Sequence, residues 1–134
     1  MSLPQFFRLA GLTTLILGTS LIFFPNEILM FFDGQNIADF AHFIRFLGTA
    51  LIGFSVLNWY GARLAHNTEA MLIAVTANFT SLALATAIDL LMLTSHTMNS
   101  RGLLILALHL SFALGFGYWI SQIRKKIAAQ KVRS

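Results

Sequence analysis

Residues 70–88 read AMLIAVTANFTSLALATAI, a run of 19 residues without a charged side chain. About 20 mainly apolar residues in a helix are enough to cross the hydrocarbon core of a membrane. The run does not alternate between apolar and polar residues, as a strand of a transmembrane barrel would. It therefore predicts a membrane-spanning helix.

Three more uncharged stretches of similar length lie elsewhere in the chain, at Leu9–Phe24, Phe46–Ala62 and Gly102–Ile123. Allowing for polar residues at the ends, we expect four helices near residues 6–24, 41–62, 70–93 and 102–122. The predicted fold class is an all-α integral membrane protein, a single four-transmembrane-helix bundle over residues 1–134. Residues 123–134 are expected to form a short basic tail.

The composition agrees with a chain that lies mostly in lipid. Of its 134 residues 57% are apolar and 10% are charged, whereas about 25% are charged in soluble domains. The absence of cysteine excludes disulfides, Cys-ligated metal sites and thiol catalysis. No connection is long enough to fold as a separate domain, so any chemistry must lie within the helices, at their ends or in a partner protein.

The basic residues predict the orientation. Arg45 and Arg101 fall on one side of the predicted membrane, and the other seven of the nine basic residues fall on the opposite side: Arg8, Arg63, Arg124, Lys125, Lys126, Lys131 and Arg133. Because basic residues are enriched on the cytoplasmic side, both termini are expected in the cytoplasm, with the chain in a cell membrane such as the bacterial inner membrane. The basic tail is expected to touch anionic lipid; it lacks the aromatic residues of a nucleic-acid reader.

A pattern is shared by the first two predicted helices. Phe6-Phe7-Arg8-x-x-Gly11-x3-Leu15-x2-Gly18 matches Phe43-Ile44-Arg45-x-x-Gly48-x3-Ile52-x2-Ser55. The spacing places each set on one helical face, with an Arg at the entrance and small residues deeper in. The favoured interpretation is a shared packing solution; the alternative is an inverted repeat around a transport path. Across the four helices the predicted helix-packing residues are Gly11, Gly18, Gly48, Ser81, Ala85, Ser111 and Gly115.

These residues also carry a resemblance to a known group. The Gly-containing first span that ends in Pro25, followed by Arg45-x-x-Gly48-x2-Leu51-x-Gly53, resembles the DoxX-like and related families of small bacterial four-helix membrane proteins. The resemblance covers roughly residues 6–63. It implies a four-helix fold, and some members of the group are membrane subunits of quinone-linked oxidoreductases.

Asp89 is the one acid well inside a predicted span, and His109 lies at a broadly similar depth in the next. Arg45 enters its span from the same side, so the three side chains are predicted to form an intramembrane polar cluster. Asp89 is interpreted either as a structural pair with Arg45 or as a proton or ligand site. For His109 the alternatives are a hydrogen bond to a neighbouring helix or contact with a cofactor, a haem or a quinone.

The leading functional hypothesis is a non-enzymatic accessory subunit that packs against itself or a larger membrane complex. It rests on the fourth predicted helix, in which Ala107, Ser111 and Gly115 lie nearly opposite Phe112 and Phe116. Two alternatives stay open: a redox subunit associated with a quinone, haem or pigment through His109, and a small proton-coupled transporter that uses Asp89. The sequence contains no phosphate loop, hydrolase motif or cluster of metal ligands.

Overall fold

The computed structural model describes residues 1–33, 41–64, 67–96 and 99–131. Its helices are α1 (Leu3–Phe23), α2 (Pro25–Asp33), α3 (Ala41–Gly61), α4 (Thr68–Thr94) and α5 (Gly102–Lys131). All except α2 are long and apolar enough to cross a membrane. The prediction of an all-α chain with four such helices is confirmed, and the protein is a multi-pass membrane protein in lipid contact.

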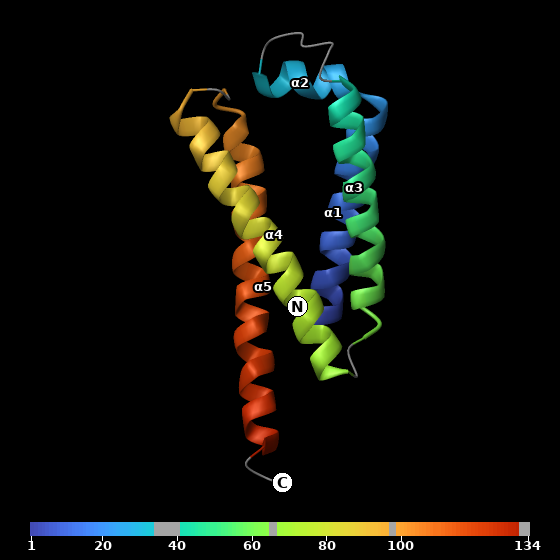
Figure 1. The fold of residues 1–134 in the computed structure, drawn as a ribbon, viewed down its shortest axis with the longest axis vertical. Helices are drawn as coiled ribbons and strands as arrows, with labels where there is room; N and C mark the ends of the chain where they lie inside the picture. Colours follow the sequence, from blue (N-terminus) through green and yellow to red (C-terminus); the bar gives the residue numbers. More distant parts are fainter. Residues whose placement is uncertain (34–40, 65–66, 97–98, 132–134) are drawn as a thin grey trace.

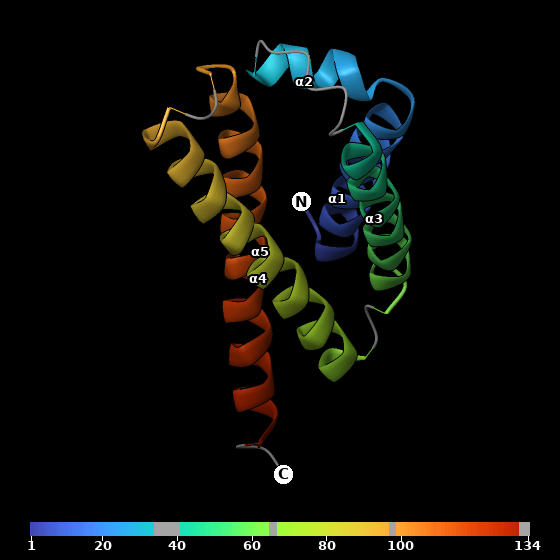
Figure 2. The ribbon, with the colours of Figure 1, turned by 45° about the horizontal axis from the view of Figure 1, so that its top comes forward.

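The helices form two pairs, α1 with α3 and α4 with α5, and each pair is antiparallel (Figure 1). We call the end of the molecule where α1 and α4 finish the outer end, and the end that carries both chain termini the inner end. Toward the outer end the two pairs diverge, and α2 lies across the gap between their ends (Figures 1 and 2).

Local sequence explains where several helices begin and end. At the start of α1, the Ser2 and Gln5 side chains form a reciprocal capping box. The α1 helix ends at Phe23, and Pro25 then opens α2, since proline is favoured in the first turn of a helix and lacks the N–H needed to continue the previous one. Asn67 caps α4 by accepting a hydrogen bond from the Ala70 backbone N–H.

The C-terminal part of the chain differs from the prediction. The segment 123–131 continues α5 and is not a separate tail, because its residues include neither glycine nor proline and most of them favour a helix. Residues 132–134 lie outside the described residues. The basic side chains of Arg124, Lys125 and Lys126 thus project from a helix that extends beyond the apolar stretch.

The α2 helix is tied to the opposite helix pair at its C-terminal end. The Phe31 carbonyl oxygen accepts hydrogen bonds from Asn99 Nδ2 (3.2 Å) and Arg101 Nη1 (3.1 Å). The Arg101 guanidinium also lies 4.8 Å from the centre of the Phe31 ring, within the range of a cation–π interaction. Helix α2 therefore bridges the two pairs.

The α1–α3 pair is held by close backbone approach. A Cβ atom built on Gly48 would lie 2.7 Å from the Gly18 carbonyl oxygen, and one built on Gly18 would lie 2.7 Å from the Gly48 carbonyl oxygen. Ser55 donates a 2.7 Å hydrogen bond to the Gly11 carbonyl oxygen nearby. The first small residue of each set thus meets the last small residue of the other set, as antiparallel helices require, and this favours the interpretation of the pattern as a packing solution.

Two matched substitutions in α3 test this contact. Gly48→Ala should lower the free energy of unfolding in detergent by about 1–3 kcal/mol, because its Cβ forces the helices apart. Gly53→Ala should leave the midpoint of thermal unfolding unchanged or raised, since nothing lies within 4 Å of its Cβ and alanine favours a helix. Equal effects at the two positions would show that the α1–α3 crossing does not depend on this approach.

Candidate functional site: an acid–imidazole pair between α4 and α5

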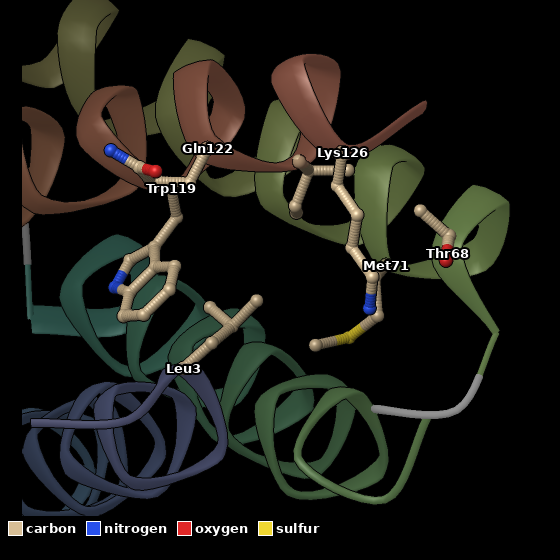
Figure 3. A pocket seen from close by; sticks show the side chains of 7 residues that line it. Leu3, Thr68, Met71, Trp119, Gln122 and Lys126 are labelled. Carbon is tan, nitrogen blue, oxygen red and sulfur yellow. The ribbon is translucent and has the colours of Figure 1, made fainter. Parts of the chain in front are cut away.

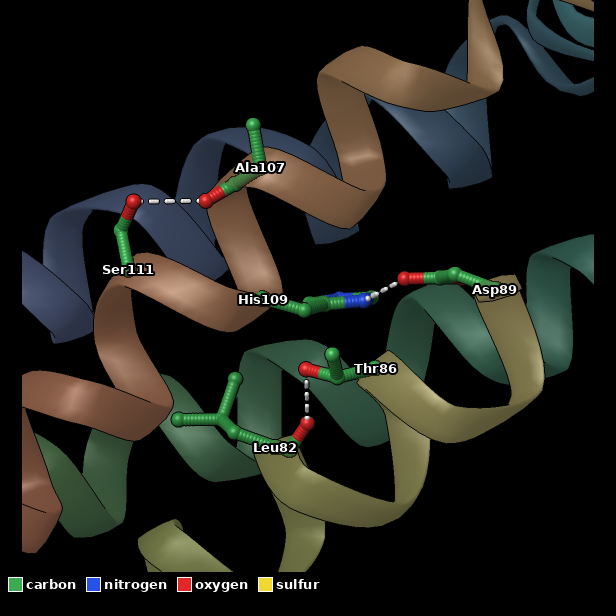
Figure 4. A network of polar contacts seen from close by, with 6 residues as sticks. All are labelled: Leu82, Thr86, Asp89, Ala107, His109 and Ser111. Atoms are coloured by element: carbon green, nitrogen blue, oxygen red, sulfur yellow. Dashed lines mark hydrogen bonds and ion pairs between the residues drawn. The ribbon is translucent and has the colours of Figure 1, made fainter. Parts of the chain in front are cut away.

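The candidate site consists of one carboxyl group and one imidazole on neighbouring helices. Asp89 lies five residues before the end of α4, and His109 lies seven residues into α5. At the rise of a helix these offsets place the two residues about 8 Å and about 10 Å from the outer ends of their helices. His109 Nδ1 and Asp89 Oδ2 are 2.6 Å apart (Figure 4).

The burial of Asp89 follows from the helical pattern of α4. Met71, Val75 and Asp89 are the buried residues of this helix, and their spacing places them on the face that meets α5. The Asp89 side chain is only 9% exposed, whereas the His109 side chain is 25% exposed. An unpaired carboxylate is costly in such a position, so the imidazole is the group that makes this burial tolerable.

The net charge of the Asp89–His109 pair determines whether its free ring nitrogen donates or accepts a hydrogen bond. In a medium of low polarity the electrically neutral form of the pair is favoured, either a carboxylate with an imidazolium or a carboxylic acid with a neutral imidazole. In both cases His109 Nε2 carries a proton, because Nδ1 is engaged with Asp89. The neutral pair thus offers an N–H donor at Nε2, and loss of that proton creates an acceptor there.

The other ring nitrogen of His109 is therefore the reactive point of the site. Nε2 has no hydrogen-bond partner among residues 1–33, 41–64, 67–96 and 99–131. Thr86, close to the pair in Figure 4, directs its hydroxyl to the Leu82 carbonyl oxygen of its own helix. The arrangement can donate or accept one proton and can orient one polar ligand atom.

Arg45 does not join this pair. Its Nε donates a 3.3 Å hydrogen bond to the Ile22 carbonyl oxygen of α1, so it serves the other helix pair. The reason is that α3 diverges from α4 and α5 toward the outer end, where Arg45 lies (Figure 1). The structure brings together two members of the predicted three-residue cluster, and the partner expected for Asp89 is replaced by His109.

The residues predicted to pack helices fall into two groups. Gly11, Gly18 and Gly48 lie in the α1–α3 contact, and Gly115 of α5 lies beneath the Phe6 ring of α1. By contrast, Ser81 and Ser111 are exposed and Ala85 is half-buried. The Ser111 hydroxyl bonds the Ala107 carbonyl oxygen of its own helix (Figure 4). Ser81 therefore does not pack against a helix within the described part of the chain.

A further buried polar side chain, Asn58, lies in the contact between α1 and α3. Asn58 of α3 is 1% exposed and its Oδ1 has no hydrogen-bond partner in the described part of the chain. It lies against α1, where a Cβ on Gly11 would be 3.3 Å from the Asn58 Cβ. In the sequence, a lone asparagine in a predicted span indicates a hydrogen bond to a neighbouring helix. The sequence does not indicate that its side-chain oxygen lacks a partner.

The histidines limit which cofactors the pair can serve. His42 in the first turn of α3 and His96 just after α4 are both exposed at the outer end. Within the described ranges, no second histidine therefore lies at the depth of His109 to complete a two-histidine haem site. His66 lies outside the described residues.

Comparisons with known proteins give no relative for this chain. No family model matches it, and neither a curated protein nor a solved structure does so. The resemblance of residues 6–63 to DoxX-like proteins thus stays a prediction.

A double-mutant cycle measures the bond between the two side chains. Asp89→Ala and His109→Ala should each destabilise the protein and together show a coupling free energy of about 1 kcal/mol, within the range found for interhelical hydrogen bonds in membranes. The measurement is thermal or denaturant unfolding in one detergent. Thr86→Ala is the matched control: its hydroxyl bonds its own helix, so its coupling to His109→Ala should be near zero.

Proposed function

We propose that this chain is a non-enzymatic membrane subunit that assembles laterally, with itself or with a larger membrane complex, through the outward face of α4. The observation that carries the proposal is the exposure of small and hydroxyl-bearing residues there. Thr76, Ala77, Thr80 and Ser81 form two adjacent rows on the face that points away from α5, and all four are exposed. Small residues on a lipid-facing helix let another helix backbone approach closely.

The sparse packing of the α4–α5 helix pair supports the proposal. Only 11% of the residues in the apolar windows of α4 and α5 are buried, compared with 28% in α1. On α5, Phe112 and Phe116 are buried against α1, whereas Ala107 and Ser111 are exposed. Gly115, the third small residue predicted on the face of Ala107 and Ser111, instead lies beneath the Phe6 ring of α1. The α4–α5 pair therefore presents more unoccupied helix surface than α1 does.

The proposal includes the location and orientation of the chain. We place it in a cell membrane, the bacterial inner membrane being the simplest case, with both termini in the cytoplasm. The inner end carries Arg8, Arg63 and the basic residues 124–126, whereas Arg101 lies at the outer end. This distribution follows the enrichment of basic residues on the cytoplasmic side.

Because the chain contains no native cysteine, single cysteines can map the proposed contact. Ser81→Cys labelled with a maleimide photocrosslinker should give one discrete protein adduct on illumination of native membranes. Gly53→Cys, on an open position of α3, is the control and should give little or none. Mass spectrometry of the adduct then shows whether the partner is a second copy or another protein.

Two results would contradict lateral assembly through α4. Equal adduct yields from positions 53 and 81 would indicate random collision in the membrane. Labelled position 81 yielding only lipid adducts would show that this face is covered by lipid.

A second function is favoured by the bond between Asp89 and His109. The neutral pair presents Nε2–H, the group that hydrogen-bonds a quinone carbonyl oxygen, and it can release and recover one proton. A haem iron would instead bind the lone pair of Nε2 while Nδ1–H donates to the Asp89 carboxylate, the usual arrangement of a metal-bound histidine. The pair thus suits a quinone contact or a proton-coupled transport site at Asp89, and within the described ranges it lacks the second histidine of a two-histidine haem site.

Spectra of protein purified from its own membrane test this second function. A quinone-linked role predicts co-purified quinone, detected by extraction and mass spectrometry, that falls at least fivefold in His109→Ala. Thr86→Ala, beside the pair, should retain it. A visible absorption band that is lost in His109→Ala would instead identify haem. Equal amounts of quinone in the unsubstituted chain and both variants would show that His109 does not contact the quinone.

A further inference from the structure

A hollow at the inner end lies where three helices meet. It is bounded by the start of α1, the first turn of α4 and the extension of α5 beyond the apolar stretch, and its volume is about 170 Å³. The hollow is lined by Leu3, Thr68, Met71, Trp119, Gln122, Ile123 and Lys126. It lies at the opposite end of the helices from the acid–imidazole pair, which lies near the outer end.

The walls of the hollow divide by chemistry. Leu3, Met71 and Ile123 are buried apolar side chains that form its floor. Lys126 and Trp119 stand on opposite sides, with Leu3 between them (Figure 3). Lys126 supplies a cation, and Thr68 and Gln122 supply polar groups. A molecule that fits must therefore combine an anionic group with an apolar portion.

The charge around the hollow favours an anion. The inner end carries the exposed cations Arg124, Lys125 and Lys126. Among residues 1–33, 41–64, 67–96 and 99–131, Glu69 in the first turn of α4 is the one acid at this end. Lys126 comes one turn after the uncharged stretch that ends at Ile123, which is the level at which lipid head groups begin. Trp119, about two turns before Lys126, is a residue type enriched at membrane interfaces.

We infer that this hollow binds the head-group end of an anionic phospholipid, with the phosphate at Lys126 and the glycerol region against Leu3, Met71 and Ile123. The volume is below the roughly 300–1,000 Å³ of pockets that enclose a whole drug-sized ligand. It therefore holds only one end of the lipid, and the acyl chains lie along the exposed apolar surface of the helices. Free phosphate would gain nothing from the apolar floor.

Neighbouring lysines on the same helix provide a matched test. Lys125 and Lys126 are both exposed and carry the same charge, but they point about 100° apart around α5, and only Lys126 lines the hollow. The delipidated full chain would be titrated with phosphatidylglycerol or with phosphatidylcholine of identical acyl chains. Native mass spectrometry would then measure the fraction of protein that retains each lipid.

The expected result is preferential retention of phosphatidylglycerol by the unsubstituted chain. Lys126→Ala should weaken that retention about fivefold, the factor that corresponds to about 1 kcal/mol for a basic residue near an anionic membrane. Lys125→Ala should weaken it less than twofold. Unchanged midpoints of thermal unfolding in both variants would show that neither substitution disturbs the fold.

Three outcomes would overturn the inference. Equal loss in the two lysine variants would mean that the basic segment attracts lipid without a defined site. Equal retention of the two lipids would show that the net negative charge of the lipid head group does not contribute to binding. Displacement of phosphatidylglycerol by millimolar inorganic phosphate would identify free phosphate as the ligand.

Discussion

The contact between the two helix pairs depends on two adjacent phenylalanines of α1. The Phe6 ring lies on Gly115 of α5, where a Cβ atom would collide with it, and the Phe7 ring lies on Gly61 of α3, 2.8 Å from where a Cβ would be. Both rings also pack against Phe116, with centroid separations of 4.7 Å and 5.4 Å. One short segment of α1 thus contacts α3, its partner within one pair, and α5 of the other pair.

This junction matters because apolar burial alone drives little association in lipid. Acyl chains are as apolar as leucine, so helices associate through close packing, hydrogen bonds between helices and lipid entropy. The glycines permit the close packing at the inner half, and Val75, Phe7 and Phe116 are fully buried there. Toward the outer end, α2 and the contacts of Phe31 with Asn99 and Arg101 connect the diverging pairs.

The three features used for functional inference occupy different parts of this architecture. The acid–imidazole pair lies in the outer half between α4 and α5, and the lipid-binding hollow lies at the inner end. The α4 face with Thr76 and Ser81 points away from α5. Asp89, His109, Ser81 and Lys126 lie outside the buried apolar cluster that contains Phe6 and Phe7, whereas the floor of the hollow belongs to that cluster.

The sequence by itself determined the number, approximate bounds and membrane character of the long helices. Hydrocarbon excludes unpaired backbone groups, so long uncharged runs such as 70–88 have almost no alternative to a helix. It also indicated the close-packing role of Gly18 and Gly48, because the same spacing of small residues occurs in both helices. These properties depend on local composition and periodicity, which are readable along one chain.

Only the tertiary structure decided which polar groups meet. Depth along the helices favoured Arg45 as the partner of Asp89, but depth does not give the rotation or divergence of a helix. The divergence of the pairs leaves Arg45 with Ile22, and the rotation of α4 and α5 brings Asp89 to His109. The hollow at Lys126 likewise exists because α5 remains helical beyond Ile123 and passes the starts of α1 and α4, an arrangement that depends on packing between segments distant in sequence.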